Sequence, residues 1–282
     1  MSILVFIKAI AITLVILHAP LMNASEVKNV DWKYLVKYDG KEVGYNRIVF
    51  RPFSNGERLS EISATIIPSF WGDTNVYSFM FEYYNNDQQI VQAEYVMLYD
   101  NYLLITRLTP TQGVRLKQSF LVYQLDKVKL AAIQSEWSQT FEHMLSNALL
   151  AESFSKQTKG LKPIDSDVTY INPKDFDITI SSLSIRLPEE IVARKGQALR
   201  VFDPESEDDN QYYDISIQTQ TLEAEKLFPL QKNIKQSFQK VNVTLSKHRE
   251  IDYWYDLSTQ PASLVKVLVR SPKEHIEIVL IK

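Results

Sequence analysis

The feature that most limits the possible folds is a run of seven strand-like segments in the first half of the chain, each followed by a turn signal. Asp39-Gly40 is the strongest signal, because Asp-Gly is typical of a two-residue hairpin turn. The expected strands are Trp32–Tyr38, Glu42–Phe53, Glu57–Ile67, Thr74–Tyr84, Gln88–Tyr99, Tyr102–Thr109 and Val114–Leu125. This succession predicts an antiparallel β-meander, and the length of several segments predicts that twist curls it into a half-barrel or open barrel.

The period of the apolar residues changes in the middle of the chain. Ile133, Trp137 and Phe141 recur at helical spacing and predict one or two amphipathic helices between 130 and 154. Leu183–Arg194 is a second candidate helix, so we expect a helical insertion over about 130–195. The stripe formed by Trp137, Phe141, Met144 and Ala148 is expected to pack on the sheet and cover part of its concave face.

Strand-like segments return in the last third. They are Ala198–Phe202, Gln211–Thr219, Thr221–Phe228, Phe238–Ser246, Glu250–Tyr255, Leu264–Arg270 and His275–Ile281. The predicted fold class is therefore mainly β: a curved antiparallel meander sheet, as a half-barrel or open barrel, with an α-helical insertion.

The amino-terminal segment has the layout of a secretory signal peptide. Lys8 precedes the apolar stretch Ala9–Leu17, and small residues precede a polar chain after Ala24. The stretch is too short to span a bilayer, which takes about 20 apolar residues, although an uncleaved anchor is the alternative. We expect a signal peptide over 1–24, one β-rich domain over 25–282, no membrane span in the mature chain, and a periplasmic or secreted location.

Composition excludes several classes of protein. The formal net charge is −3, and loss of Lys8 with the signal would make it −4, so the basic surface of a nucleic-acid-binding protein is not expected. The chain has no cysteine, which excludes disulfides, thiol chemistry and the lipid-modified cysteine of a bacterial lipoprotein.

Residues for catalysis are not marked out by any pattern. His143, His248 and His275 are far apart in sequence, so they predict three unrelated histidines and no metal site. The chain lacks a G-x-S-x-G elbow and a glycine-rich phosphate loop. None of the 34 acidic residues is distinguished by its context, so we expect them on the solvated surface. No catalytic residue, metal ligand or cofactor is predicted.

An aromatic stripe is the candidate ligand-binding feature. Tyr77, Phe79, Phe81 and Tyr83 alternate along one expected strand and so share one face. Two interpretations remain open. The rings form core packed under the helices, or they line a cavity for an apolar ligand together with the helix residues Trp137 and Phe141.

Several segments resemble a family of uncharacterised exported bacterial proteins, known as a domain of unknown function. Tyr34–Gly44 is similar to its Y-x-V-x-x-D-G-x-x-I-G front hairpin, with Val43 in place of Ile. Val201–Asp203, Trp254–Asp256, Leu264–Val267 and His275–Leu280 follow in the order of the family's later V-F-D, W-Y-D, L-V-K-V and final-strand segments. The resemblance implies a curved antiparallel sheet, somewhat similar to the half-barrels that carry lipoproteins across the periplasm. It implies no catalytic residues.

These observations favour a non-catalytic envelope protein that binds an apolar or amphiphilic ligand in the concave sheet. The expected partner is a lipid, a glycolipid or an envelope protein. A purely structural or interaction module is the alternative, and a hydrolase built from scattered residues ranks last.

Overall fold

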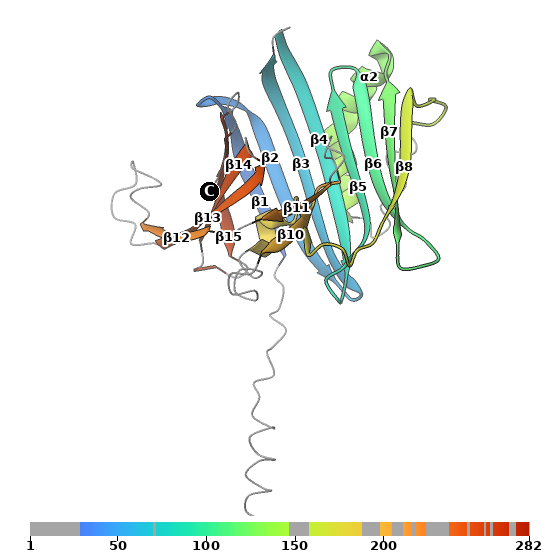
Figure 1. Cartoon of the computed structure of the whole chain (residues 1–282). Helices are drawn as coiled ribbons and strands as arrows, with labels where there is room; N and C mark the ends of the chain where they lie inside the picture. The colour runs from blue at the N-terminus through green and yellow to red at the C-terminus, as the bar shows by residue number, and fades with distance from the viewer. Residues whose placement is uncertain are drawn as a thin grey trace, which may run out of the picture.

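The computed structural model describes residues 29–69, 72–146, 158–187, 198–204, 211–215, 218–223, 237–246, 249–256, 258–259, 262–270 and 275–281. Most of these residues belong to one 13-stranded antiparallel sheet (Figure 1). Its strands are β1 (Val30–Tyr38), β2 (Lys41–Phe53), β3 (Gly56–Ser69), β4 (Gly72–Asn85), β5 (Ile90–Tyr99), β6 (Tyr102–Pro110), β7 (Leu116–Gln124), β8 (Asp165–Ile171), β12 (Gln218–Glu223), β13 (Ser237–Ser246), β14 (Arg249–Asp256), β15 (Ser263–Arg270) and β16 (His275–Leu280). The predicted mainly-β meander is confirmed.

The strand order is almost entirely sequential. It runs β12-β13-β14-β15-β16-β1-β2-β3-β4-β5-β6-β7-β8, so β8 and β12 are edges and the sheet stays open. The exception is the pairing of β1 with β16, with Tyr34 opposite Leu280 and Tyr38 opposite Ile276. We call this pairing the seam, because it joins the front hairpins to the carboxyl-terminal strands.

The first hairpin has the turn that its sequence predicts. Asp39 and Gly40 both adopt positive φ, 47° and 79°. A two-residue loop needs this backbone to match the twist of its strands, and glycine adopts it without strain.

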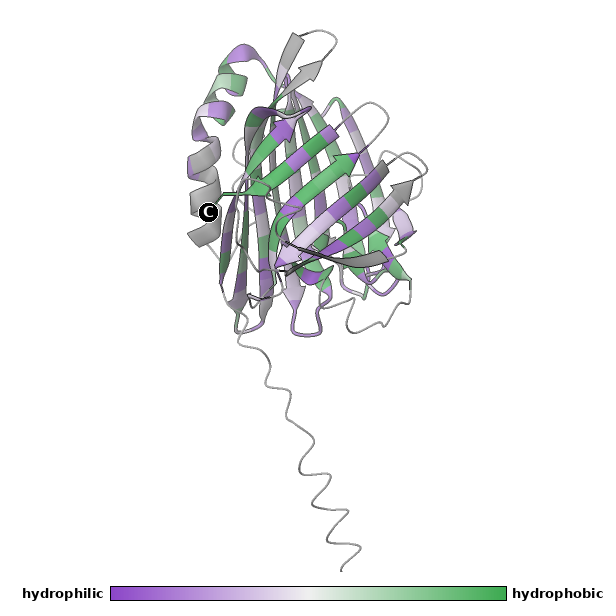
Figure 2. Cartoon of the chain, turned by 90° about the vertical axis from the view of Figure 1, so that its left-hand side faces the viewer, coloured by the Kyte–Doolittle hydropathy of each residue, from purple (hydrophilic) through white to green (hydrophobic). Residues whose placement is uncertain are grey.

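The two faces of the sheet hold separate cores. On the concave face, apolar side chains from both ends of the sheet, such as Tyr34, Leu116 and Tyr255, belong to one cluster. A three-stranded sheet of β9 (Ile178–Thr179), β10 (Leu199–Phe202) and β11 (Tyr212–Ile215) packs into that face, together with the helical residues 183–187. Helix α2 (Lys127–Ser146) lies against the opposite, convex face (Figure 2).

The helical insertion expected over about 130–195 is wrong for part of that range. The structure has helix α2, then the strand β8, which pairs with β7, then β9. Six of the seven β8 residues are exposed, including the alternate residues Val168 and Tyr170, so the strand has no buried apolar face. The second candidate helix is present over 183–187, and residues 188–194 lie outside the described residues.

Candidate functional site

The aromatic stripe of β4 does share one face of the sheet. Phe79 and Phe81 are only 3% and 1% exposed, in the same cluster as Trp137 of α2, which is also 3% exposed. The ring centroids of Tyr77 and Trp137 lie 5.6 Å apart. Tyr83 lies further along the strand, 6.4 Å from the ring of Phe53. This close packing favours the interpretation of the stripe as core beneath the helix.

The helix lies on the other side of the sheet from the one expected. We expected its stripe to cover the concave face, whereas α2 covers the convex face of β4–β7. The concavity is filled instead by β9–β11, residues 183–187 and the strands that curl over from the carboxyl-terminal end. The side chains of Phe141 and Met144, and all of Ala148, lie outside the described residues.

Two hydrogen bonds hold the elements that occupy the concave face in place. The Tyr255 hydroxyl of β14 donates to the carbonyl of Leu183 at 2.8 Å. The Tyr34 hydroxyl of β1 donates to the carbonyl of Leu264 in β15 at 3.0 Å. Both hydroxyls are buried, so these bonds satisfy donors that would otherwise be costly to bury. They hold the curled end of the sheet around the inserted segment.

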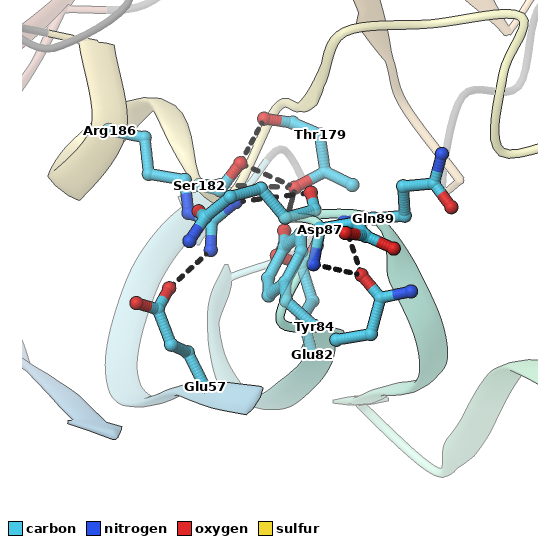
Figure 3. Close-up of polar contacts among 10 residues, drawn as sticks. Glu57, Glu82, Tyr84, Asp87, Gln89, Thr179, Ser182 and Arg186 are labelled. Carbon is cyan, nitrogen blue, oxygen red and sulfur yellow. Dashed lines mark hydrogen bonds and ion pairs between the residues drawn. The ribbon is translucent and has the colours of Figure 1, made fainter. Parts of the chain in front are cut away.

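A buried carboxylate, Glu82, organises one end of this face (Figure 3). Its Oε1 accepts from the Tyr95 hydroxyl at 2.6 Å. Its Oε2 accepts from the Tyr84 hydroxyl at 2.5 Å and from Thr179 Oγ1 of β9 at 2.9 Å. Burial raises the pKa of Glu82, and these three hydrogen bonds oppose the rise.

Arg186 completes this arrangement, which we call the Glu82 cluster: Glu82, Tyr84, Tyr95, Thr179 and Arg186. The guanidinium lies 3.9 Å from the centre of the Tyr84 ring and pairs with Glu57 of β3 at 2.7 Å. Its positive charge also lowers the pKa of Glu82 against the effect of burial. The cluster fastens β9 and residues 183–187 to the sheet, because Thr179 donates to Glu82, and Arg186 pairs with Glu57 and contacts the Tyr84 ring.

Two half-open cavities lie nearer the seam. One, of about 200 Å³, is lined by side chains of β1, β2, β3 and β16, among them Val36 and Ile276. The other, of about 160 Å³, reaches under residues 180–184 and against β14 and β15, where Val267 lines it. Both are mainly apolar, and they adjoin because Asn46, Glu61 and Ile278 line both. We call them together the seam cavity.

Glu61 and Asn46 are the polar pair of the seam cavity. Asn46 Nδ2 donates to Glu61 Oε1. Asn46 is 5% exposed, and its Oδ1 is buried without a hydrogen-bond partner in the part of the chain that the structure describes. Burial raises the pKa of Glu61, the charge of Glu82 raises it further, and the bond from Asn46 lowers it.

The expectation that acidic residues lie on the surface is wrong for several of them. Glu82, Glu94 and Asp252 are 0%, 2% and 0% exposed. Neighbouring residues carry the signal that could have identified Glu82: Met80 and Tyr84, two positions away on either side, are apolar and aromatic. Alternate residues share a face, so Glu82 belongs to a buried row. Glu61 has a weaker signal, since Leu59 precedes it by two positions and Ser63 follows.

The predicted lone histidines can be placed in part. His275 begins β16 and is exposed, His143 belongs to α2, and His248 lies outside the described residues. Among the described residues, no three His, Cys, Asp or Glu side chains gather as metal ligands would. Within the same residues, none of the helices combines the length and apolar character needed to cross a membrane.

Comparison with known proteins gives a fold and no activity. The chain matches no protein-family model, and no curated protein matches it. A crystal structure of a β-barrel-like protein of the domain of unknown function DUF1849 from Brucella abortus is similar, with a TM-score of 0.52 and 8% sequence identity over 91% of this chain and 97% of that one. That likeness supports a barrel-like β fold. The front and carboxyl-terminal hairpin motifs remain a prediction.

Proposed function

We propose that this protein is a non-catalytic carrier or sensor that binds an apolar or amphiphilic ligand in the seam cavity. The observation that carries the proposal is the cavity itself, mainly apolar, half-open and set in the concave face. Ligand sites are concave and mostly apolar, with a few polar groups that orient the ligand. Glu61 and Asn46 are such groups. The convex aromatic stripe, by contrast, is packed against a helix.

An apolar probe tests this function. Ile278→Trp would fill the cavity from β16, whereas Val279→Trp places the same ring on the opposite face of the same strand. We expect the wild-type protein and Val279→Trp to bind octanol in calorimetric titration, and Ile278→Trp to lose binding by about 10-fold or more. Absence of octanol binding to the wild type would refute the proposal. Equal loss in both variants would show that the cavity is not the site.

Export is a separate part of the proposal. The amino-terminal layout supports cleavage after Ala24, and residues 1–28 lie outside the described residues. Intact-mass measurement on fractionated cells should find a chain that begins at or near Ser25 in the envelope or medium. A full-length mass in a membrane pellet would replace export with anchoring. Lipids, glycolipids or an envelope protein are then the proposed partners, because these meet an exported protein.

A purely structural module is the second candidate. The Glu82 cluster favours it, since the bond from Thr179 to Glu82 and the ion pair of Arg186 with Glu57 tie the concave insertion to the sheet. In that case native mass spectrometry of the protein purified from its own envelope would show the unmodified mass alone, before and after lipid extraction.

A further inference from the structure

The polar pair in the seam cavity has an excess of acceptors. Asn46 uses its amide nitrogen on Glu61, which leaves its Oδ1 buried and unpartnered beside the carboxylate. Buried polar atoms in folded proteins are nearly always hydrogen-bonded, and one that is not needs an explanation. Two acceptors side by side, on neighbouring strands β2 and β3, together require donors.

Among the described residues that line the seam cavity there is no lysine or arginine to supply these donors. The charged group acting on Glu61 within the described structure is another carboxylate, Glu82, which lies diagonally across β3 and β4 because Glu61 faces Met80. Glu61 is half-buried, and a carboxylate partly withdrawn from water in a mainly apolar cavity is stabilised by a partner of opposite charge. A ligand that brings a positive charge would supply that partner.

Reversing the amide of Asn46 does not remove the imbalance. Its Oδ1 would then face the carboxylate oxygen, which is favourable only if Glu61 is protonated and donates. The Nδ2 group would be left buried without an acceptor. That arrangement would suit a ligand whose head group accepts hydrogen bonds, such as a fatty acid. Comparing the affinity for an acid with the affinity for an amine therefore distinguishes the two arrangements.

We infer that the seam cavity takes an amphiphile whose head is a protonated amine, with the ammonium group donating to Glu61 and to Asn46 Oδ1 while its alkyl chain lies against Val36, Val267 and Ile278. This inference rests on the proposed function and adds the chemistry of the head group. A compact ammonium has three donors, enough for both acceptors and a further bond. An alkylamine keeps its charge at neutral pH because its pKa resembles that of lysine, about 10.4.

Three probes of equal chain length test the head group. Octylamine, octanol and octanoate should be titrated calorimetrically into the mature protein at pH 7. We expect octylamine to bind about 30-fold more tightly than octanol, because a charge paired within an apolar site contributes strongly. Octanoate should bind most weakly, since it places a second negative charge beside Glu61.

Glu61→Gln should abolish the preference for octylamine, so that the ratio of octylamine to octanol affinity falls from about 30 to about 1. Glu277→Gln is the matched control: it makes the same change on β16, where Glu277 pairs with Lys266 on the opposite face from Ile278. It should bind all three probes as the wild type does. Glu61→Asp retains the charge and should keep part of the amine preference. This variant also keeps the test decisive if Glu61→Gln folds poorly.

The outcomes separate this inference from the proposed function. Equal affinity for octylamine and octanol, with octanol lost in Ile278→Trp, would overturn the amine head group and leave the apolar site intact. Tighter binding of octanoate would overturn it in favour of a protonated Glu61. Failure of all three probes would refute both proposals.

Mass spectrometry of material extracted from the natively purified protein identifies the source of the head group. Either an amino-headgroup lipid or a free alkylamine would support the inference. Which of the two is found shows whether the amine comes from a membrane lipid or from a free molecule. An anionic lipid without an amine would contradict it.

Discussion

Glu82 and Glu61 lie on adjacent strands and on the same concave face, yet their carboxylates differ in the hydrogen-bond donors and charged groups around them. Glu82 is fully buried and receives three hydroxyl donors, with Arg186 nearby. Glu61 borders a cavity, receives one donor from Asn46 and has no protein cation among the described residues that line that cavity. Burial raises the pKa of both carboxyl groups.

The difference shows how a carboxylate with a structural role can be distinguished from one that binds a ligand. A buried charge whose lone pairs are all satisfied by the protein belongs to the architecture, because any ligand would have to displace those donors. A half-buried charge with few protein donors beside a cavity is costly to the fold, and a ligand can offset that cost. By this criterion the Glu82 cluster fastens the insertion, and Glu61 belongs to the proposed binding site.

The largest expected effect contrasts the two residues directly. Glu82→Ala removes the acceptor of three buried hydroxyl groups and should lower the free energy of unfolding by about 4 kcal/mol. Glu61→Ala makes the same change where few donors depend on the carboxylate, and should cost about 1 kcal/mol or less. Urea denaturation of both variants measures this. Equal losses would break the distinction.

Arg186 gives the next effect. Arg186→Ala removes a well-buried ion pair with Glu57 and the contact with the Tyr84 ring, so we expect a loss of about 2 kcal/mol in unfolding free energy. Arg200 is the matched control, since it lies 5.4 Å from the Tyr212 ring but its side chain is 52% exposed. Arg200→Ala should cost about 0.5 kcal/mol or less. A comparable loss in both variants would contradict a fastening role for Arg186.

The smallest effect is on pH dependence. A carboxyl group whose pKa is higher in the folded than in the unfolded chain binds more protons when folded. Stability is therefore highest below the unfolded pKa, about 4.3 for glutamate, and falls as the pH rises through the folded pKa. Glu61→Gln cannot titrate, so its unfolding free energy should fall less than that of the wild type over this interval. If the unfolding free energies of the two proteins change with pH in parallel, burial does not raise the pKa of Glu61.

Much of the fold follows from local sequence. Turn pairs such as Asp39-Gly40 and Asp100-Asn101 set the hairpins, and the structure has positive φ at Asp39, Gly40 and Asp100. The meander order then follows because adjacent strands joined by short turns pair with each other. Strand β8 is harder to predict, because it is a short, exposed edge strand that pairs with β7 across the intervening helix α2 and not across a short turn.

The site could not be predicted in the same way. Alternation correctly groups Tyr77, Phe79, Phe81 and Tyr83 on one face, but it does not say which face becomes concave. That depends on the seam and on β9–β11, which pack into the concavity from distant parts of the chain. The pairing of Asn46 with Glu61 likewise depends on the β2–β3 register, which places Glu61 opposite Ile48, two residues from Asn46.

The seam has a consequence for the time course of folding. Apart from β7 and β8, which have α2 between them, the other neighbouring strands of the described sheet follow one another closely in the chain, so those hairpins can form from local encounters within about microseconds. The seam instead closes a loop from Tyr34 to Leu280, and such distant contacts form slowly because chain entropy is lost before they stabilise the chain. Val36, Ile276 and Ile278 lie at this junction. Because residues of both β1 and β16 line the seam cavity, the cavity takes its final shape only after this distant pairing has formed.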